Sequence, residues 1–193
     1  MRRAPEDRQR DPERTKARIL EAALAEFAAK GFAGARVSEI AARAGVNKQL
    51  ISYYFGGKEG LYQAIGDHWR ERETALAAPA GSLGELIASY VRFNVAHGDF
   101  GRLLVWDGLT GGAPDPHFAE GVRAMVEDLR GRQRAGELPA DLDPAALAVA
   151  LFAIAAAGVA FPQVVAAVSD LTPEEFGEHY ATQMRTLVDR LSG

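Results

Sequence analysis

Residues 37–61 read VSEIAARAGVNKQLISYYFGGKEGL and contain two short apolar clusters on either side of a glycine. Ile40 lies in the first cluster, Ile51 lies in the second, and Gly45 stands between them. Glycine adopts a positive φ at little cost, as a sharp turn between helices requires, and Asn47 is a favoured N-cap for a second helix. The spacing therefore predicts a tight helix-turn-helix in which Ile40 and Ile51 pack together.

The second helix of this motif presents polar side chains on its outward side. These are Lys48, Gln49, Ser52 and Tyr53, with Tyr54 at the edge. Such groups suit hydrogen bonds to phosphates and base edges, and the start of a helix suits entry into the major groove of DNA. The motif therefore indicates DNA binding, while Tyr54 is either a core residue or a phosphate contact.

Outside this stretch, apolar residues recur at intervals of three and four, which is typical of helices. The sequence contains no convincing strand and no internal repeat. Capping residues and prolines mark helix starts at residues 11–13, 82–85, 115–116, 143–144 and 172–175. We therefore expect an all-α fold with nine helices.

The composition excludes several kinds of site. None of the 193 residues is a cysteine, which removes disulfides, thiolate zinc sites and cysteine nucleophiles. Hydrophobic residues make up 48% of the chain, enough for a core, so wholesale disorder is not expected. No apolar stretch follows the arginines after Met1, so we expect no secretory signal and a cytoplasmic protein.

The charge changes sign along the chain. Residues 1–60 contain 12 of the 22 basic and 8 of the 26 acidic side chains, although the whole chain carries a formal charge of −4. A basic N-terminal segment followed by an acidic remainder suggests that only the N-terminal segment binds a polyanion. An ordinary solvated surface would give a similar pattern, so the charge alone does not decide between them.

Residues 144–168 contain no charged side chain, so a membrane span must be weighed. Gly158 and Pro162 interrupt the run, and acids rather than basic residues flank it. We therefore expect no membrane span but a helix buried between other helices, including those of a second subunit, with the last helix completing a four-helix interface. The residues predicted for this interface are Leu147, Leu151, Ile154, Phe161, Phe176, Tyr180, Met184, Leu187, Val188 and Leu191.

The stretch at residues 37–61 resembles the DNA-binding domain of TetR-type transcriptional repressors. The matching residues are Gly31-Phe32, Ile40-Ala41, Ala44-Gly45-Val46, Tyr53-Tyr54-Phe55 and Lys58-Glu59 followed by Leu61. The resemblance implies a homodimeric repressor that leaves a palindromic operator on double-stranded DNA when a small-molecule inducer binds. It also implies a DNA-binding domain at residues 11–57 and a ligand-binding and dimerisation domain at 58–193. The arm at residues 1–10 mixes arginines with acids, so we expect it to be disordered, with contact to a DNA groove as the alternative.

The resemblance also assigns contacts residue by residue. It places Lys48, Gln49, Leu50 and Ser52 on the base-facing side of the recognition helix and Tyr53, Tyr54 and Lys58 at the DNA backbone. It matches Thr15 to a phosphate contact and Ser38 to a position that sometimes reads a base. The family commonly has Thr or Ser as the cap of the second helix, whereas Ala35-Arg36-Val37 stand there, so Arg36 is expected to contact phosphate instead.

The C-terminal part of the sequence is less specific. Eight residues either line an apolar ligand pocket with a few polar anchors or belong to the core: Phe93, Asn94, His97, Phe100, Trp106, Phe118, Met125 and Phe152. The pairs His97 with Asp99 and Asp115 with His117 lack further ligands, so we expect no metal and no cofactor.

Two other functions remain open at this point. One is a DNA-binding regulator or architectural protein that is gated by a protein or not gated at all. The other is a helical carrier or enzyme, but the sequence has no HExxH motif, no glycine-rich phosphate loop and no evident nucleophile with its base. We therefore do not expect an enzyme.

Overall fold

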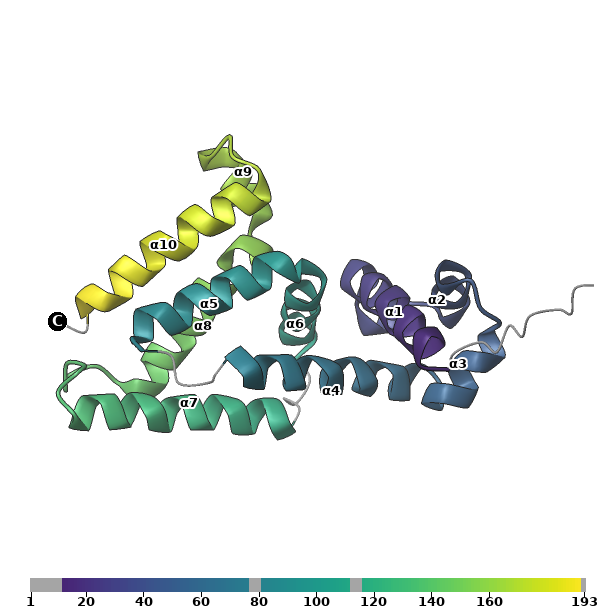
Figure 1. Ribbon diagram of the computed structural model, residues 1–193, viewed down its shortest axis with the longest axis horizontal. Helices are drawn as coiled ribbons and strands as arrows, with labels where there is room; N and C mark the ends of the chain where they lie inside the picture. The colour runs from purple at the N-terminus through teal and green to yellow at the C-terminus, as the bar shows by residue number, and fades with distance from the viewer. Residues whose placement is uncertain (1–11, 77–80, 112–115, 192–193) are drawn as a thin grey trace, which may run out of the picture. The chain divides into compact units, whose positions relative to one another are not determined.

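The computed structural model describes residues 12–76, 81–111 and 116–191, and these ranges contain ten α-helices and no strand (Figure 1). The expected all-α class is confirmed. The predicted arm at residues 1–10 and the predicted cap Asp11 lie outside the described residues. In chain order the helices are α1 (Pro12–Gly34), α2 (Val37–Ala44), α3 (Lys48–Phe55), α4 (Lys58–Leu76), α5 (Leu83–Ala96), α6 (Gly98–Thr110), α7 (Pro116–Arg134), α8 (Pro144–Ala160), α9 (Pro162–Val168) and α10 (Pro173–Leu191).

The tenth helix arises from a break in the charge-free stretch, where we expected one long helix. Phe161 leaves the helical conformation with φ −129° and ψ 53°, and the axes of α8 and α9 meet at a bend of 75°. Pro162 has no N–H to continue the helix, and its ring disfavours the helical conformation of the residue before it.

Hydropathy gives one finding about membranes for the described residues. Taken singly, each helix there is too short or too polar to cross a bilayer. The bent pair α8 and α9 meets the criterion only when both helices are combined, by length and composition alone.

The chain divides into two compact units, residues 1–71 and 72–193, and the division falls within α4. In the N-terminal unit, the buried side chains of Ile19, Ile40 and Ile51 come from α1, α2 and α3. Phe27 of α1 is fully buried, and its ring lies 5.9 Å from that of Phe32 and 5.1 Å from that of Tyr62, centroid to centroid. This aromatic cluster joins α1 to α4.

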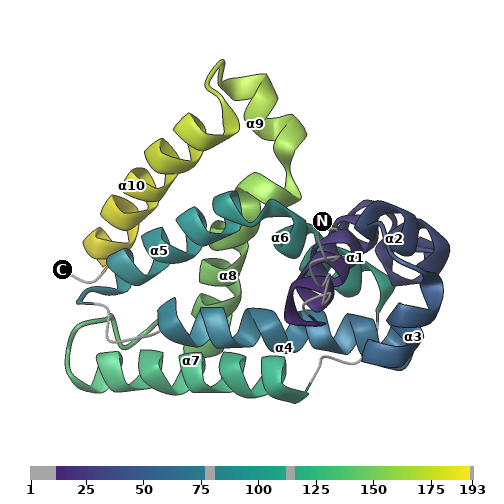
Figure 2. The same ribbon diagram turned by 45° about the vertical axis from the view of Figure 1, so that its right-hand side comes forward.

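In the C-terminal unit, α10 lies beside α5 in both views (Figures 1 and 2). The helices run antiparallel, since Arg92 near the end of α5 pairs with Glu178 near the start of α10, and Glu85 pairs with Arg185 at the other end. Helices α7 and α8 complete the core. Its buried members are Leu83, Ile87, Ala88, Val91, Leu129, Leu138, Ala148, Leu151, Ala181 and Val188.

The predicted helix starts of this unit are confirmed. Ser82 Oγ accepts from the backbone N–H of Glu85 at 3.1 Å while the Glu85 carboxylate accepts from that of Ser82 at 3.4 Å, which makes a capping box. Residues 172–175 form the same arrangement at the start of α10. The Asp143 carboxylate caps α8 by accepting from the N–H of Ala146 at 2.7 Å.

Candidate DNA-binding site

The turn between α2 and α3 is a Schellman motif centred on Gly45. Gly45 has φ 62° and ψ 40°, and its N–H donates to the carbonyl of Ala42 at 3.1 Å. The N–H of Val46 donates to the carbonyl of Ala41 at 3.0 Å, which gives the pair of bonds that defines the motif. The predicted positive φ at Gly45 is confirmed, and it turns the chain sharply into α3.

Helix α3 begins where the sequence predicted. The N–H of Gln49 donates to Asn47 Oδ1 at 2.9 Å, so Asn47 is the N-cap. Ile51 is fully buried beneath α3 and faces the same core as Ile40 of α2. This packing fixes which side of α3 turns outward.

The outward side of α3 carries the four polar residues predicted to face DNA. Lys48, Gln49, Ser52 and Tyr53 are all exposed, and the Tyr53 side chain is 80% exposed. A large aromatic side chain left that open in a helix of eight residues is available to contact a partner. The arrangement offers an ammonium, an amide and two hydroxyls at the start and middle of one helix.

Leu50 and Tyr54 lie at the edge of this surface and are half-buried. The Tyr54 ring packs edge-on to Tyr53 at 5.1 Å and lies 5.8 Å from the ammonium of Lys16 on α1. Tyr54 therefore takes part in packing. Thr15, matched by resemblance to a phosphate contact, is buried with only 9% of its surface exposed.

Lys58, predicted to reach the DNA backbone, makes contacts inside the unit. Its ammonium lies 4.7 Å above the Phe32 ring and donates to the carbonyl of Ala33 at 3.3 Å. It therefore ties the start of α4 to the end of α1, and the cation and the aromatic face attract each other.

The start of α2 differs from a conventional helix start. Arg36 is the N-cap residue and has no side-chain hydrogen bond to the first turn, as its type predicts. The side chains of Arg36 and Ser38 are exposed on this turn. Beneath them, Glu26 of α1 is buried with 2% exposure and accepts from the backbone N–H of Arg36 at 3.4 Å. Sequence reasoning missed Glu26, although an acid on the apolar face of an amphipathic helix was a usable signal.

The eight residues predicted for a ligand pocket separate into smaller groups. The Phe93 ring lies edge-on to His97 at 4.7 Å, and Phe118 lies edge-on to Phe152 at 5.8 Å. The Asn94 amide donates to the carbonyl of Ala155 at 3.0 Å, so it is engaged within the subunit. The other three differ in burial: Phe100 is buried, Met125 packs against the core, and Trp106 is exposed.

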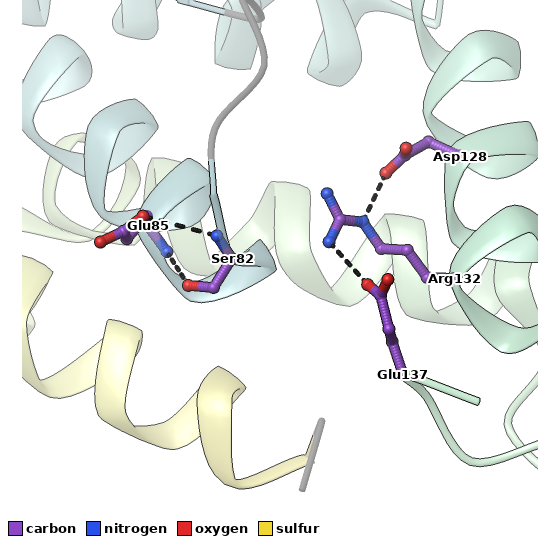
Figure 3. A network of polar contacts seen from close by, with 5 residues as sticks. All are labelled: Ser82, Glu85, Asp128, Arg132 and Glu137. Atoms are coloured by element: carbon purple, nitrogen blue, oxygen red, sulfur yellow. Dashed lines mark hydrogen bonds and ion pairs between the residues drawn. The ribbon is translucent and has the colours of Figure 1, made fainter. Parts of the chain in front are cut away.

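A pocket of about 340 Å³ lies elsewhere in this unit and was not predicted. Arg132 of α7 stands in its wall between Asp128 and Glu137, at N–O distances of 2.8 and 3.1 Å (Figure 3). The hydrogen bond that the Arg132 guanidinium donates to the Asp128 carboxylate is the main cause that raises the pKa of Arg132 above its usual value. Figure 3 also shows the neighbouring capping box of Ser82 and Glu85. Because the guanidinium and the two carboxylates satisfy one another, the pocket has the character of a structural ion-pair network.

Among the described residues, no three His, Asp or Glu side chains gather as metal ligands.

The residues predicted for the dimer interface fall into three groups. Phe161, Leu187 and Leu191 are exposed, whereas Leu151 and Val188 are buried in the core of the subunit and have no surface to offer. The remaining five are half-buried: Leu147, Ile154, Phe176, Tyr180 and Met184. The error at Leu151 and Val188 has a simple reason: α8 is apolar all round and α10 has a broad apolar face, so periodicity does not identify the inner side.

Further apolar residues, not among those predicted for the interface, are exposed on this unit. Val149 on the outer side of α8 is 70% exposed. The others are Phe152 on α8, Val164 and Val168 on α9, and Leu171 just after α9. Exposed apolar patches of this kind mark interaction surfaces.

Sequence comparisons match both parts of the chain. A family model described as bacterial regulatory proteins, tetR family, matches residues 19–65, and one described as tetracyclin repressor-like, C-terminal domain, matches residues 82–190. The second match alone covers more than half of the chain. The first spans the helix-turn-helix described above.

Curated relatives and solved structures agree with this assignment. The HTH-type transcriptional repressor SCO4008 of Streptomyces coelicolor is 43% identical over 58% of this chain, and NicS of Pseudomonas putida, also an HTH-type transcriptional repressor, is 34% identical over 53%. The matched segments span 59% and 52% of those two relatives, between half and three fifths of their lengths. The crystal structure of the regulator SCO4942 from Streptomyces coelicolor superposes with a TM-score of 0.77 at 28% identity, covering 91% of this chain and 97% of that one. The chain therefore belongs to the tetR family of bacterial regulatory proteins.

Proposed function

We propose that this protein is a DNA-binding transcriptional regulator, a homodimeric repressor that leaves a palindromic operator when a small molecule binds its C-terminal unit. The observation that carries the proposal is the outward face of α3, where Lys48, Gln49, Ser52 and Tyr53 are exposed on a helix fixed by a capped turn. Both curated relatives are named as transcriptional repressors, which supports a regulator rather than an enzyme.

The face of α3 suits the major groove. Residues at the start of a recognition helix contact base edges, and amide and ammonium groups can read adenine or guanine there. In a two-fold dimer, the two recognition helices would meet half-sites about 34 Å apart, which is one turn of DNA. A palindromic operator follows from that symmetry.

Gln49→Ala and Lys48→Ala are expected to weaken binding to the operator by about 10- to 100-fold each, because a good base contact contributes about 1–3 kcal/mol. The operator would first be selected from genomic fragments, including those that flank the gene, and affinity would then be measured by fluorescence anisotropy at two salt concentrations. Gln63→Ala, at an exposed site on α4, is the matched control and should bind normally. Weak binding that is uniform across sequences and abolished by salt would favour an architectural protein instead.

The dimer is proposed to form through the outer side of α8 and the exposed part of α10. Leu187→Glu should weaken dimerisation at least about tenfold, because burying a carboxylate in an apolar interface is costly. Sedimentation of the unaltered protein should give twice the chain mass of 20.7 kDa. Leu109→Glu, at a 76% exposed position on α6, is the control. A monomeric unaltered protein would contradict the proposal.

The inducer is proposed to bind in the C-terminal unit close to the residues predicted for the pocket, and Trp106 gives a natural reporter there. A thermal-shift screen of metabolites should find a compound that raises the melting temperature, since a ligand that binds the native state stabilises it by mass action. The same compound should release the operator. A compound that stabilises the protein without releasing DNA would favour gating by a protein partner.

A further inference from the structure

The first turn of α2 has its backbone cap supplied by another helix. In a capping box, the side chain of the third helical residue accepts from the backbone N–H of the N-cap residue. In α2 these two residues would be Glu39 as the acceptor and Arg36 as the donor. Instead, the acceptor for the Arg36 N–H is the carboxylate of Glu26 on α1, at 3.4 Å. Glu26 of α1 therefore takes the part that the third residue of the helix takes in a capping box.

The charge on Glu26 is retained in spite of its burial. Its carboxylate lies 2.7 Å from the ammonium of Lys30, and that hydrogen bond is the main cause that lowers the pKa of Glu26 below its usual value. A buried carboxylate without such a partner would tend to become neutral. A negative charge consequently remains at the start of α2, where the helix dipole is positive.

The opposite end of α2 receives a positive charge from the same helix. The guanidinium of Arg18 on α1 donates to the carbonyl of Ala44, the last residue of α2. A cation at this end is favourable, because the carbonyl groups of the last turn carry the negative end of the dipole. The Arg18 guanidinium also lies against the turn between α2 and α3. A Cβ added to Gly45, the residue at the centre of that turn, would be only 2.8 Å from it.

The spacing of the two charged residues matches the helix they cap. Glu26 and Arg18 are eight positions apart on α1, which is about 12 Å at 1.5 Å per residue. Helix α2 has eight residues, so its length is the same. Because Glu26 follows Arg18 while the start of α2 precedes its end, α1 and α2 must run antiparallel for both contacts to form.

We propose that Glu26 and Arg18 are positioning residues that cap the two ends of α2 from α1 and thereby hold the helix-turn-helix in the geometry that binds DNA. The inference rests on the proposed DNA-binding function, which it deepens. Arg36 and Ser38, two exposed residues at the start of α2, are held at one end, and the turn into α3 is held at the other.

The Glu26 end is tested by comparing Glu26→Leu and Glu26→Gln with Glu21→Gln, which alters an exposed carboxylate on the same helix. Glu26→Leu should speed amide hydrogen exchange at Arg36 and weaken operator binding, each by about tenfold or more, the cost of a hydrogen bond to a charged group. Glu26→Gln keeps an acceptor, so its effects should be smaller, and Glu21→Gln should have none. The dependence of affinity on salt should stay unchanged, because Glu26 neutralises no phosphate.

The Arg18 end is tested with Arg18→Met and Arg18→Lys. A positioning role predicts weaker operator binding in Arg18→Met, partial rescue in Arg18→Lys, and an unchanged salt dependence. A salt slope reduced by about one would make Arg18 a phosphate contact and overturn its assignment.

The outcomes separate this inference from the proposed function. Unchanged exchange at Arg36 and unchanged affinity in both Glu26 variants would overturn the capping role, even if the protein binds its operator. A protein that binds no DNA, but whose Arg36 exchange accelerates in Glu26→Leu, would overturn the proposed function and support capping. If Glu26→Leu does not fold, Glu26→Gln, which removes the charge but keeps an acceptor, should still give the smaller effects, and their absence would overturn the capping role.

Discussion

Replacing Phe27 with alanine is expected to destabilise the N-terminal unit by about 3–5 kcal/mol, the usual cost of removing a fully buried phenylalanine. Phe27 has no exposed surface and contacts both Phe32 and Tyr62, so the substitution leaves a cavity between α1 and α4. Such a loss is a large share of the total, because whole domains are stable by only about 5–15 kcal/mol. The unfolded fraction should rise steeply at 37 °C, and operator binding should weaken with it.

The chain provides a selective readout for this experiment. It has two tryptophans, Trp69 in the N-terminal unit and Trp106 in the C-terminal unit. In a Trp106→Phe background, urea unfolding followed by fluorescence reports Trp69 alone. Phe27→Leu, which preserves most of the volume, should cost less than about 1.5 kcal/mol. A loss below about 1 kcal/mol in Phe27→Ala would show that the cluster does not stabilise the unit.

Gly177→Ala is expected to destabilise the C-terminal unit by about 1–3 kcal/mol, the typical cost of overpacking a core, although alanine is the better helix former. A Cβ at Gly177 would lie 2.6 and 2.9 Å from the two methyl carbons of Val95. The Val95 side chain is branched and stiff, so α5 and α10 would have to move apart.

Gly121 on α7 is the matched control for this experiment. It is also a helical glycine, but a Cβ there meets nothing within 4 Å. Gly121→Ala should therefore stabilise the unit by about 0.5–1 kcal/mol. Urea unfolding in a Trp69→Phe background, followed by Trp106 fluorescence, measures both. Equal effects of the two alanines would show that α5 and α10 are not in close contact at Gly177.

Much of the fold was predictable because its signals are local. Gly45 and Asn47 define the turn and the cap of α3 through their own backbone preferences, and both contacts form as expected. Capping boxes depend on two residues of one helix and were equally readable. The break at Pro162 was visible in the sequence, but whether the chain bends there or continues depends on packing, and nine helices were expected instead of ten.

The parts of the site that were missed depend on contacts between distant segments. Glu26 and Arg36 are ten residues apart, and only the folded chain brings the carboxylate beneath the first turn of α2. Lys58, which the resemblance places at the DNA backbone, also packs its ammonium on Phe32, and that contact was not visible in the sequence. Leu151 was assigned to the dimer interface, but it faces the subunit core, since a helix that is apolar all round does not reveal its inner side.

The contacts of the lysines have a chemical consequence. All four lysines of the chain lie in its first 60 residues, and those at positions 16, 30 and 58 are engaged with a carboxylate or with an aromatic ring and a carbonyl. Lys48 is exposed at the start of α3. A limiting dose of an acylating reagent should therefore label this amine ahead of the other three lysine side chains. The label would report directly on occupancy of the outward face of α3, and residues 61–193 would remain unmodified.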